Sequence, residues 1–278
     1  MKALSIILNV SLFNYLVYTR SYKDLLVVCT IMIKILSRLL LVSLLFSSNL
    51  IMAKQEIKIG VGNFPPFFVE EEQQGLFIEI TEEIFKQLPD YSVKFIYMSN
   101  HRLLHEINSG KRIDVACNIF SDSKVDAFLS SPIFRFTDVA VSKNSAKLDL
   151  NKVEDLKGVS IAAYQGAKEL LGADFKEMAL ANPQYSEHSQ PKDTTYMMVA
   201  GQKDVRIGDI HIFLHDLTSK RYKNEAQIDV NDFTIHRLWP DVYSHMAFKD
   251  EALRNSVDEV IEELTANGRI EAIYLKYQ

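Results

Sequence analysis

The residues best placed to hold a small charged ligand stand where an expected strand gives way to an expected helix. Gln165, Gly166 and Ala167 follow the apolar run Val159–Ala163 and precede a helical pattern. The first N–H groups of a helix have no partner inside the helix and favour an anion, and glycine allows close approach to the backbone. This turn therefore predicts a binding site for a small anionic group.

The histidines of the sequence do not form a metal site. His101 and His105 are four apart on one expected helix face, a metal-compatible spacing, but no third ligand is placed beside them. His211 and His215 belong to a run that we expect to be a strand, where they would be about 13 Å apart, too far to share an ion. We expect neither a metal nor another cofactor.

Cysteine usage excludes an internal disulfide in an exported product. Cys29 lies in the hydrophobic leader, and Cys117 is the one cysteine in the rest of the chain. Cys117 ends an apolar, strand-like run, which favours a buried and inert thiol over a nucleophile.

Composition excludes disorder and argues against nucleic acid as a partner. The 278 residues are 47% hydrophobic and 24% charged, enough for a sizeable core. With 31 basic and 36 acidic side chains the net charge is −5, so no basic excess is available to bind a phosphate backbone.

Residues 1–53 are basic and apolar and precede an acidic remainder, a pattern typical of export. A signal peptide starting at Met32 fits best, with Lys34 and Arg38 before the apolar stretch Leu39–Phe46 and cleavage after Ala53. Met32 would then be the true start. The alternative is an uncleaved anchor that holds the rest of the chain to a membrane. The leader predicts a protein of the periplasm of a Gram-negative bacterium.

Beyond the leader, strand and helix patterns alternate. Strands are expected at residues 57–61, 93–97 and 113–117, and helices at 80–88 and 103–109, with Gly110 as a left-handed cap. After about residue 139 the pattern repeats, with strands expected at 159–163 and 210–214 and helices at 195–201 and 253–264. This alternation predicts parallel strand pairing and two α/β lobes with a ligand cleft between them.

Several motifs match one family in order and spacing, although each alone is weak. They are Phe64–Phe67, Gly75–Ile80, Ile107–Asp114, Leu129–Phe134, Val153–Gly158 and Asn267–Tyr274. Together they resemble the family 3 bacterial extracellular solute-binding proteins, the amino-acid-type binding proteins of ABC transporters.

The resemblance implies a type II periplasmic-binding-protein fold with two crossover strands. Lobe 1 would comprise residues 54–138 and 245–278, and lobe 2 residues 139–244. It also implies a monomeric, non-enzymatic protein whose lobes close over a small polar or anionic solute. An ABC permease or a membrane sensor would be its partner.

The resemblance also implies contacts from the first lobe. Phe64 would pack on the ligand or in the core. The loop 118–124, with Phe120 and Ser121, would supply backbone contacts, and Lys124 stands where relatives carry an arginine for the ligand carboxylate. Lysine lacks the planar fork of arginine, so Arg102 could replace it, or else lie on the surface.

From the second lobe, Asp193 and Thr194 either cap a helix or contact the ligand. Amino-acid binders place an aspartate at the end of the strand that we expect at residues 210–214, where it holds the ligand ammonium. Phe213 or Leu214 would occupy that position here, with Asp216 just beyond. An unpaired buried ammonium is costly, so this substitution argues against an α-amino acid ligand.

Two other functions stay open. Some proteins similar to this family are cyclohexadienyl dehydratases, and an enzyme of that kind would need an acid in the cleft, for which Glu79, Asp122 and Asp216 are the candidates. A membrane-anchored sensor or adaptor would retain the leader and signal through a separate partner.

Overall fold

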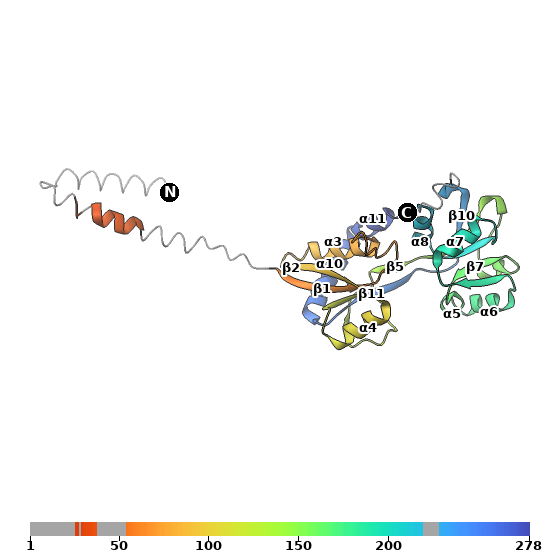
Figure 1. Cartoon of the computed structure of the whole chain (residues 1–278), viewed down its shortest axis with the longest axis horizontal. Coiled ribbons are helices and arrows are strands. Elements are labelled where there is room, and N and C mark those ends of the chain that lie inside the picture. Colours follow the sequence, from red (N-terminus) through yellow and green to blue (C-terminus); the bar gives the residue numbers. More distant parts are fainter. Residues whose placement is uncertain (1–25, 28, 38–53, 219–227) are drawn as a thin grey trace. The chain divides into compact units, whose positions relative to one another are not determined.

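A computed structural model describes residues 26–27, 29–37, 54–218 and 228–278. Residues 26–27 and 29–37 are helical, and residues 54–278 form a compact unit of their own (Figure 1). No helix among the described residues is both long and apolar enough to cross a membrane. The predicted n-region is only partly described, and the apolar stretch Leu39–Phe46 and the cleavage site after Ala53 lie outside the described residues.

The first lobe is built on a sheet with strand order β2-β1-β3-β11-β4, to which β5 is added through β11. β1, β2 and β3 are parallel, and β11 runs antiparallel to β3. The strands are β1 (Gln55–Val61), β2 (Tyr91–Tyr97), β3 (Val115–Ile119), β4 (Phe128–Leu129), β5 (Phe134–Phe136) and β11 (Val242–Phe248). The first three confirm the predicted strands to within two residues.

Helices cover both faces of this sheet, as parallel strands require (Figure 1). They are α3 (Leu76–Lys86), α4 (Asn100–Ser109), α10 (Glu251–Ala266) and α11 (Arg269–Leu275). α3 packs on α10 and α11, and α4 packs on β1 and β3. Gly110 ends α4 with φ 76°, which confirms the predicted left-handed cap.

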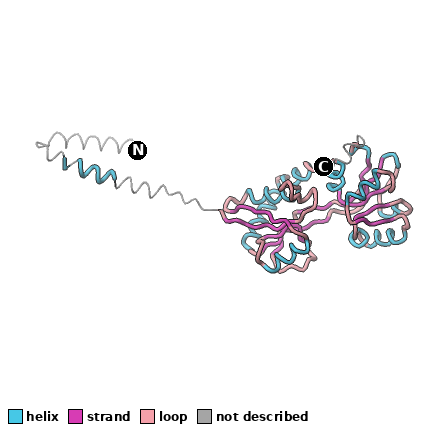
Figure 2. The backbone as a smooth tube through the Cα atoms, viewed as in Figure 1, coloured by secondary structure: helices cyan, strands magenta, loops and turns pink. Residues whose placement is uncertain are grey.

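The second lobe has a sheet with strand order β10-β6-β9-β7-β8, in which β7 is parallel to β8 and β9, and β6 is antiparallel to β9 and β10 (Figure 2). The strands are β6 (Asp138–Lys143), β7 (Ile161–Tyr164), β8 (Tyr185–His188), β9 (Val205–Asp209) and β10 (Phe233–His236). The helices are α5 (Ala167–Leu170), α6 (Ala173–Ala181), α7 (Pro191–Val199) and α8 (Ile210–Leu217), with short 3-10 turns η1 (Asn144–Ala146), η2 (Val153–Leu156) and η3 (Val230–Asp232).

The strand predicted at residues 210–214 is wrong, because this segment begins α8. Five consecutive apolar or histidine residues are as compatible with a buried helix as with a strand. Ile210, Phe213, Leu214 and Leu217 repeat at helical spacing, and Asp209 before them is a favourable N-cap. The strand is β9, immediately upstream.

The chain passes between the two sheets twice. β5 of the first sheet runs directly into β6 of the second, and the chain returns from β10 to β11. The two passing segments pair with each other, with Phe136 opposite Val242 and Arg135 opposite Tyr243. These are the two crossover strands of the predicted fold. The lobe boundaries at residues 138 and 245 stay a prediction.

Apolar clusters lie on both faces of each sheet. In the first lobe, one cluster joins the sheet to α3 and α10, and a second joins it to α4. In the second lobe, one cluster joins the sheet to α6 and another to α7 and α8. The buried residues of the two lobes form separate clusters, and Ile212 of α8 packs against the cluster of the first lobe.

Candidate ligand-binding cleft

A cleft of about 660 Å³ lies between the two lobes, beside the crossover strands. Its volume lies in the range of small-molecule binding sites. The first lobe and the crossover strands contribute Phe120, Ser121, Asp122, Phe136, Val242 and Tyr243. The second lobe contributes Asp138, Tyr164, Leu170, Leu171, Pro191, Arg206, Gly208, Asp209 and Ile212.

Asp209 closes β9 and caps α8 at the floor of this cleft. Its Oδ1 accepts hydrogen bonds from the N–H groups of His211 (2.7 Å) and Ile212 (3.2 Å), and its Oδ2 accepts one from the N–H of Thr137 (2.8 Å). Asp209 is only 5% exposed, and these donors and the helix start stabilise its negative charge. A carboxylate can accept about four hydrogen bonds, and three are made here, with Nδ1 of His211 a further 3.4 Å from Oδ1.

Asp138 is a second carboxylate on the same floor. In the antiparallel β6–β9 ladder it lies directly opposite Asp209, an arrangement that is unfavourable for like charges. The Tyr164 hydroxyl donates to Asp138 Oδ2 at 3.0 Å. Loss of solvation and the Asp209 charge raise the pKa of Asp138 to about 6, although the Tyr164 hydrogen bond and the Arg206 charge oppose this rise.

Arg206 lines the cleft and is 1% exposed. Its Nη1 donates to the carbonyls of Gly208 (3.1 Å) and Asp209 (3.0 Å), and its charge lowers the pKa of Asp138. Gly208 has φ 156°, and a Cβ there would lie 3.0 Å from Arg206 Nη2. Glycine at position 208 therefore leaves the space in which the guanidinium lies.

The walls of the cleft are apolar and aromatic. Phe120 stacks on Phe136 with ring centroids 5.8 Å apart and an angle of 27°. Tyr243 and Ile212 also line the cleft. Three of the lining residues are acidic (Asp122, Asp138 and Asp209) and one, Arg206, is basic and buried. Such a cavity favours a ligand with a cationic head and an apolar body.

The anion site predicted at Gln165–Ala167 is occupied by the chain itself. Gly166 caps α5, as predicted, but its N–H donates to Glu187 Oε2 at 2.9 Å and the N–H of Lys168 donates to Oε1 at 3.1 Å. The Tyr185 hydroxyl also donates to Glu187 (2.8 Å), and these bonds lower the pKa of the Glu187 carboxyl. Ala167 is buried in the core.

The other predicted contacts divide into two groups. Phe120 and Ser121 line the cleft. Lys124 and Arg102 do not: both are exposed, and Arg102 lies 3.6 Å from Glu106 on α4. Phe64 packs with Phe67 and Phe68 beside the core of the first lobe.

On α7, neither predicted contact reaches the cleft lining. Gln190 is the N-cap, and Pro191 occupies the first turn of the helix. Thr194 is buried and donates to the Pro191 carbonyl at 2.6 Å, whereas Asp193 lies in the first helical turn. Neither residue is the cap that the sequence suggested.

Sequence reasoning missed Asp138, Tyr164, Arg206 and Asp209. The expected aspartate was sought at Phe213 or Leu214 because the strand was placed five residues too late. With β9 ending at Asp209, the acid at the strand end is present. Nothing at this strand end therefore excludes an ammonium-bearing ligand. A helical reading of residues 210–217 would have found Asp209 as its cap.

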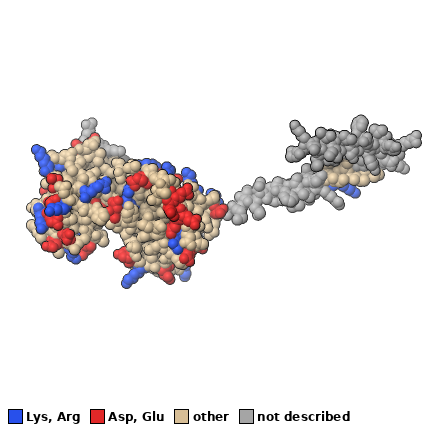
Figure 3. Space-filling view, turned by 180° about the vertical axis from the view of Figure 1, so that it is seen from behind, with Lys and Arg blue, Asp and Glu red and all other residues tan. Residues whose placement is uncertain are grey.

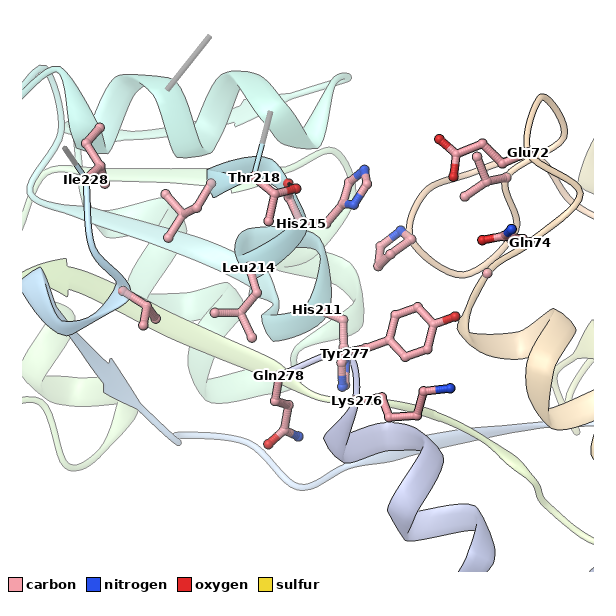
Figure 4. A pocket seen from close by; sticks show the side chains of 15 residues that line it. Glu72, Gln74, His211, Leu214, His215, Thr218, Ile228, Lys276, Tyr277 and Gln278 are labelled. Carbon is pink, nitrogen blue, oxygen red and sulfur yellow. Dashed lines mark hydrogen bonds between the residues drawn. The ribbon is translucent and has the colours of Figure 1, made fainter. Parts of the chain in front are cut away.

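A second hollow of about 570 Å³ lies where α8 faces the 66–75 loop and the last residues of the chain (Figure 4). Glu72, Gln74 and His215 are exposed there. His211 is buried, 3.4 Å from Asp209 Oδ1 through its Nδ1, and its ring contacts Phe67. Exposed polar groups bind a solute weakly because water screens them. The cleft between the lobes that contains Asp209, called the Asp209 cleft below, is therefore the better candidate.

His211 and His215 are one helical turn apart, because the segment is helical, and the separation of about 13 Å predicted for a strand no longer applies. Even so, no group of three His, Cys, Asp or Glu side chains within the described ranges could hold a metal ion. Cys117 is buried, and burial raises the pKa of its thiol to about 12.

The three acids considered for catalysis lie in different settings. Glu79 pairs with Lys276 and Tyr277, away from the cleft. Asp216 accepts a hydrogen bond from Thr195 (2.7 Å) behind the cleft floor, and burial raises the pKa of its carboxyl. Asp122 lines the cleft but is exposed.

The surface carries the acidic excess of the sequence. Figure 3 shows Asp and Glu side chains gathered on part of the first lobe, with Lys and Arg scattered over both lobes. The whole chain has a net charge of −5.

Comparisons with known proteins agree with this fold. The chain is 22% identical over 229 residues to the "Probable amino-acid-binding protein YxeM" of Bacillus subtilis (strain 168), covering 78% of this chain and 81% of that protein. The structure of an ancestral cationic amino acid solute-binding protein, AncCDT-1, matches with TM-score 0.64 and 18% identity over 82% of this chain and 97% of that one. A second AncCDT-1 structure, described as a precursor of cyclohexadienyl dehydratase, matches with TM-score 0.55 and 17% identity over 80% and 94%.

These structures share the two-sheet fold with this chain. At such low sequence identity the likeness shows the fold alone. The family model for "Bacterial extracellular solute-binding proteins, family 3" matches residues 57–278, which is nearly all of the compact unit. The chain therefore belongs to the family 3 bacterial extracellular solute-binding proteins.

Proposed function

We propose that this solute-binding protein captures a small, positively charged polar solute in the Asp209 cleft and delivers it unchanged to an ABC permease. The observation that carries the proposal is the pair of carboxylates on the cleft floor, Asp138 and Asp209, one of them 5% exposed. A cation between them would offset the like-charge repulsion. Closure of the lobes over a ligand would remove water from the cleft, and each ion pair would then act at a lower effective dielectric than in solution.

The proposal narrows the expected small polar or anionic solute to a polar solute that carries a positive charge. The N–H groups expected to hold an anion bond to Glu187, and Lys124 lies outside the cleft lining. The names of two relatives, an amino-acid-binding protein and a cationic amino acid binder, are consistent with a ligand that carries an amine.

A thermal-shift screen tests the proposal. The panel contains lysine, arginine, small aliphatic amines, glutamate and small dicarboxylates. A ligand that binds only the folded state raises the melting temperature, so cations should stabilise the protein and dicarboxylates should not. Stabilisation by dicarboxylates alone would overturn the proposal.

A second candidate function is a cyclohexadienyl-dehydratase-like enzyme. Asp138 favours it, because a carboxyl with a pKa of about 6 at the cleft could act as a general acid. One AncCDT-1 structure is described as a precursor of such an enzyme. Incubation with prephenate or arogenate decides between the functions: unchanged substrate supports the binding protein, and turnover that D138N abolishes supports the enzyme.

The family places the protein outside the cytoplasm. We further propose the periplasm of a Gram-negative bacterium, with cleavage after Ala53. N-terminal sequencing of the exported protein tests this. A first residue at Lys54 supports transport, whereas an intact leader would favour a membrane-anchored sensor.

A further inference from the structure

Two sets of backbone donors in the second lobe, at the start of α8 and at the Gly166 turn, already bond to the chain's own carboxylates. Asp209 accepts from the N–H groups of Thr137, His211 and Ile212, and Glu187 accepts from those of Gly166 and Lys168. These are the groups at strand ends and helix starts that would otherwise bind an anion. A ligand carboxylate would have to displace Asp209 or Glu187 to reach them.

The charged side chains of the cleft lining also disfavour a carboxylate on the ligand. Arg206, the basic residue of the cleft lining, donates through Nη1 to two backbone carbonyls and is 1% exposed. Its charge acts on Asp138 and also on Asp216 behind the floor. The Tyr164 hydroxyl donates to Asp138. Ser121 can offer a ligand carboxylate only a neutral hydroxyl.

From this arrangement we propose that the cleft selects an amine or guanidine that carries no carboxylate group, such as agmatine or cadaverine, over the corresponding amino acid. The inference rests on the proposed function and narrows its ligand class. A carboxylate on the ligand would be brought close to Asp122, Asp138 and Asp209. Arg206, the basic residue of the lining, already donates to two backbone carbonyls, and an unpaired carboxylate beside the three acids is costly. The cationic end would lie between Asp138 and Asp209, and the methylene chain would lie against Phe120 and Phe136.

Two matched pairs test the proposal, because each pair differs by one carboxylate. Agmatine is compared with arginine, and cadaverine with lysine, by isothermal titration calorimetry at pH 7.5 on the purified, exhaustively dialysed protein. We expect each decarboxylated amine to bind at least tenfold more tightly than its amino acid. Equal affinity within either pair, or tighter binding of the amino acid, overturns the inference and leaves the proposed function standing.

Variants distinguish a failure of this inference from a failure of the proposed function. D138N should weaken agmatine binding at least tenfold, and D174N, a matched change at an exposed acid on α6, should leave it unchanged. If D209N does not fold, D138N still tests the carboxylate pair, with circular dichroism as the folding control. Unchanged agmatine binding by D138N overturns the inference. Failure of all four cations to bind the wild-type protein overturns the proposed function as well.

Discussion

Replacing Asp138 by asparagine should stabilise the ligand-free protein at alkaline pH. Asp138 faces the Asp209 carboxylate across the β6–β9 ladder, with Tyr164 and Arg206 as its other polar neighbours. Asparagine keeps an oxygen that can accept the Tyr164 hydrogen bond and removes the charge. A site used for binding thus carries a stability cost that the variant relieves.

The size of this stabilisation follows from the raised pKa of the Asp138 carboxyl. A folded-state pKa of about 6 against an ordinary value of 3.8 corresponds to roughly 3 kcal/mol of destabilisation when Asp138 is ionised. Asp138 is half-buried, so solvent screening reduces this to about 1–3 kcal/mol. For a unit of this size that is a rise in melting temperature of about 2–12 °C.

The sign of the pH dependence is fixed by the direction of the shift. Because the folded-state pKa is raised, the protonated carboxyl favours the folded state below pH 3.8, and that stability is lost as the pH rises through about 6. D138N should therefore melt at a higher temperature than wild type at pH 8 and at the same temperature near pH 4. Differential scanning calorimetry of the ligand-free proteins measures this difference, with D174N as the matched control. A difference that does not vary between pH 4 and pH 8, or a less stable D138N at pH 8, would refute the reasoning.

Three further outcomes can be measured on other residues. D209N should be about 1–2 kcal/mol less stable than the wild type, because one backbone donor loses its acceptor. Its affinity for cations, measured by calorimetry, should be about 10- to 100-fold lower. Cation binding at wild-type affinity would show that Asp209 is not part of the site. E187Q should cost about 1 kcal/mol at pH 7 in urea denaturation. Because the pKa of Glu187 is lowered, its contribution is present above the ordinary value of 4.5 and is lost as the pH falls through the folded-state pKa, so a constant difference between pH 7 and pH 3 would be inconsistent with this. In a C29S variant at pH 8, Cys117 should react with iodoacetamide at least about 1,000-fold more slowly than a free thiol, and rapid labelling of the folded protein would show that it is not buried.

Local patterns sufficed for much of the fold. The alternation of Ile57, Ile59 and Val61 gave β1, and Gly110 marked the end of α4, because both depend on neighbours in the sequence. The segment 210–214 failed because a short apolar run does not distinguish a strand from a buried helix. That error displaced the expected aspartate away from Asp209.

The charge balance of the cleft could not be predicted in this way. Asp138 meets Asp209 only through the antiparallel register of β6 and β9, and Glu187 reaches Gly166 only because β8 pairs with β7. Register between distant strands is set by the packing of the whole lobe. The residues Phe120 and Ser121 were placed at the cleft by the resemblance, and their contact with a ligand stays a prediction.

A crystal structure of the protein soaked with agmatine tests the central claim most directly. The account predicts one ligand between Phe120 and Asp209, with a cationic nitrogen about 3 Å from a carboxylate oxygen of Asp138 or Asp209. A ligand bound at the Gly166 turn with Glu187 displaced, or held elsewhere with both aspartates uncontacted, would contradict it.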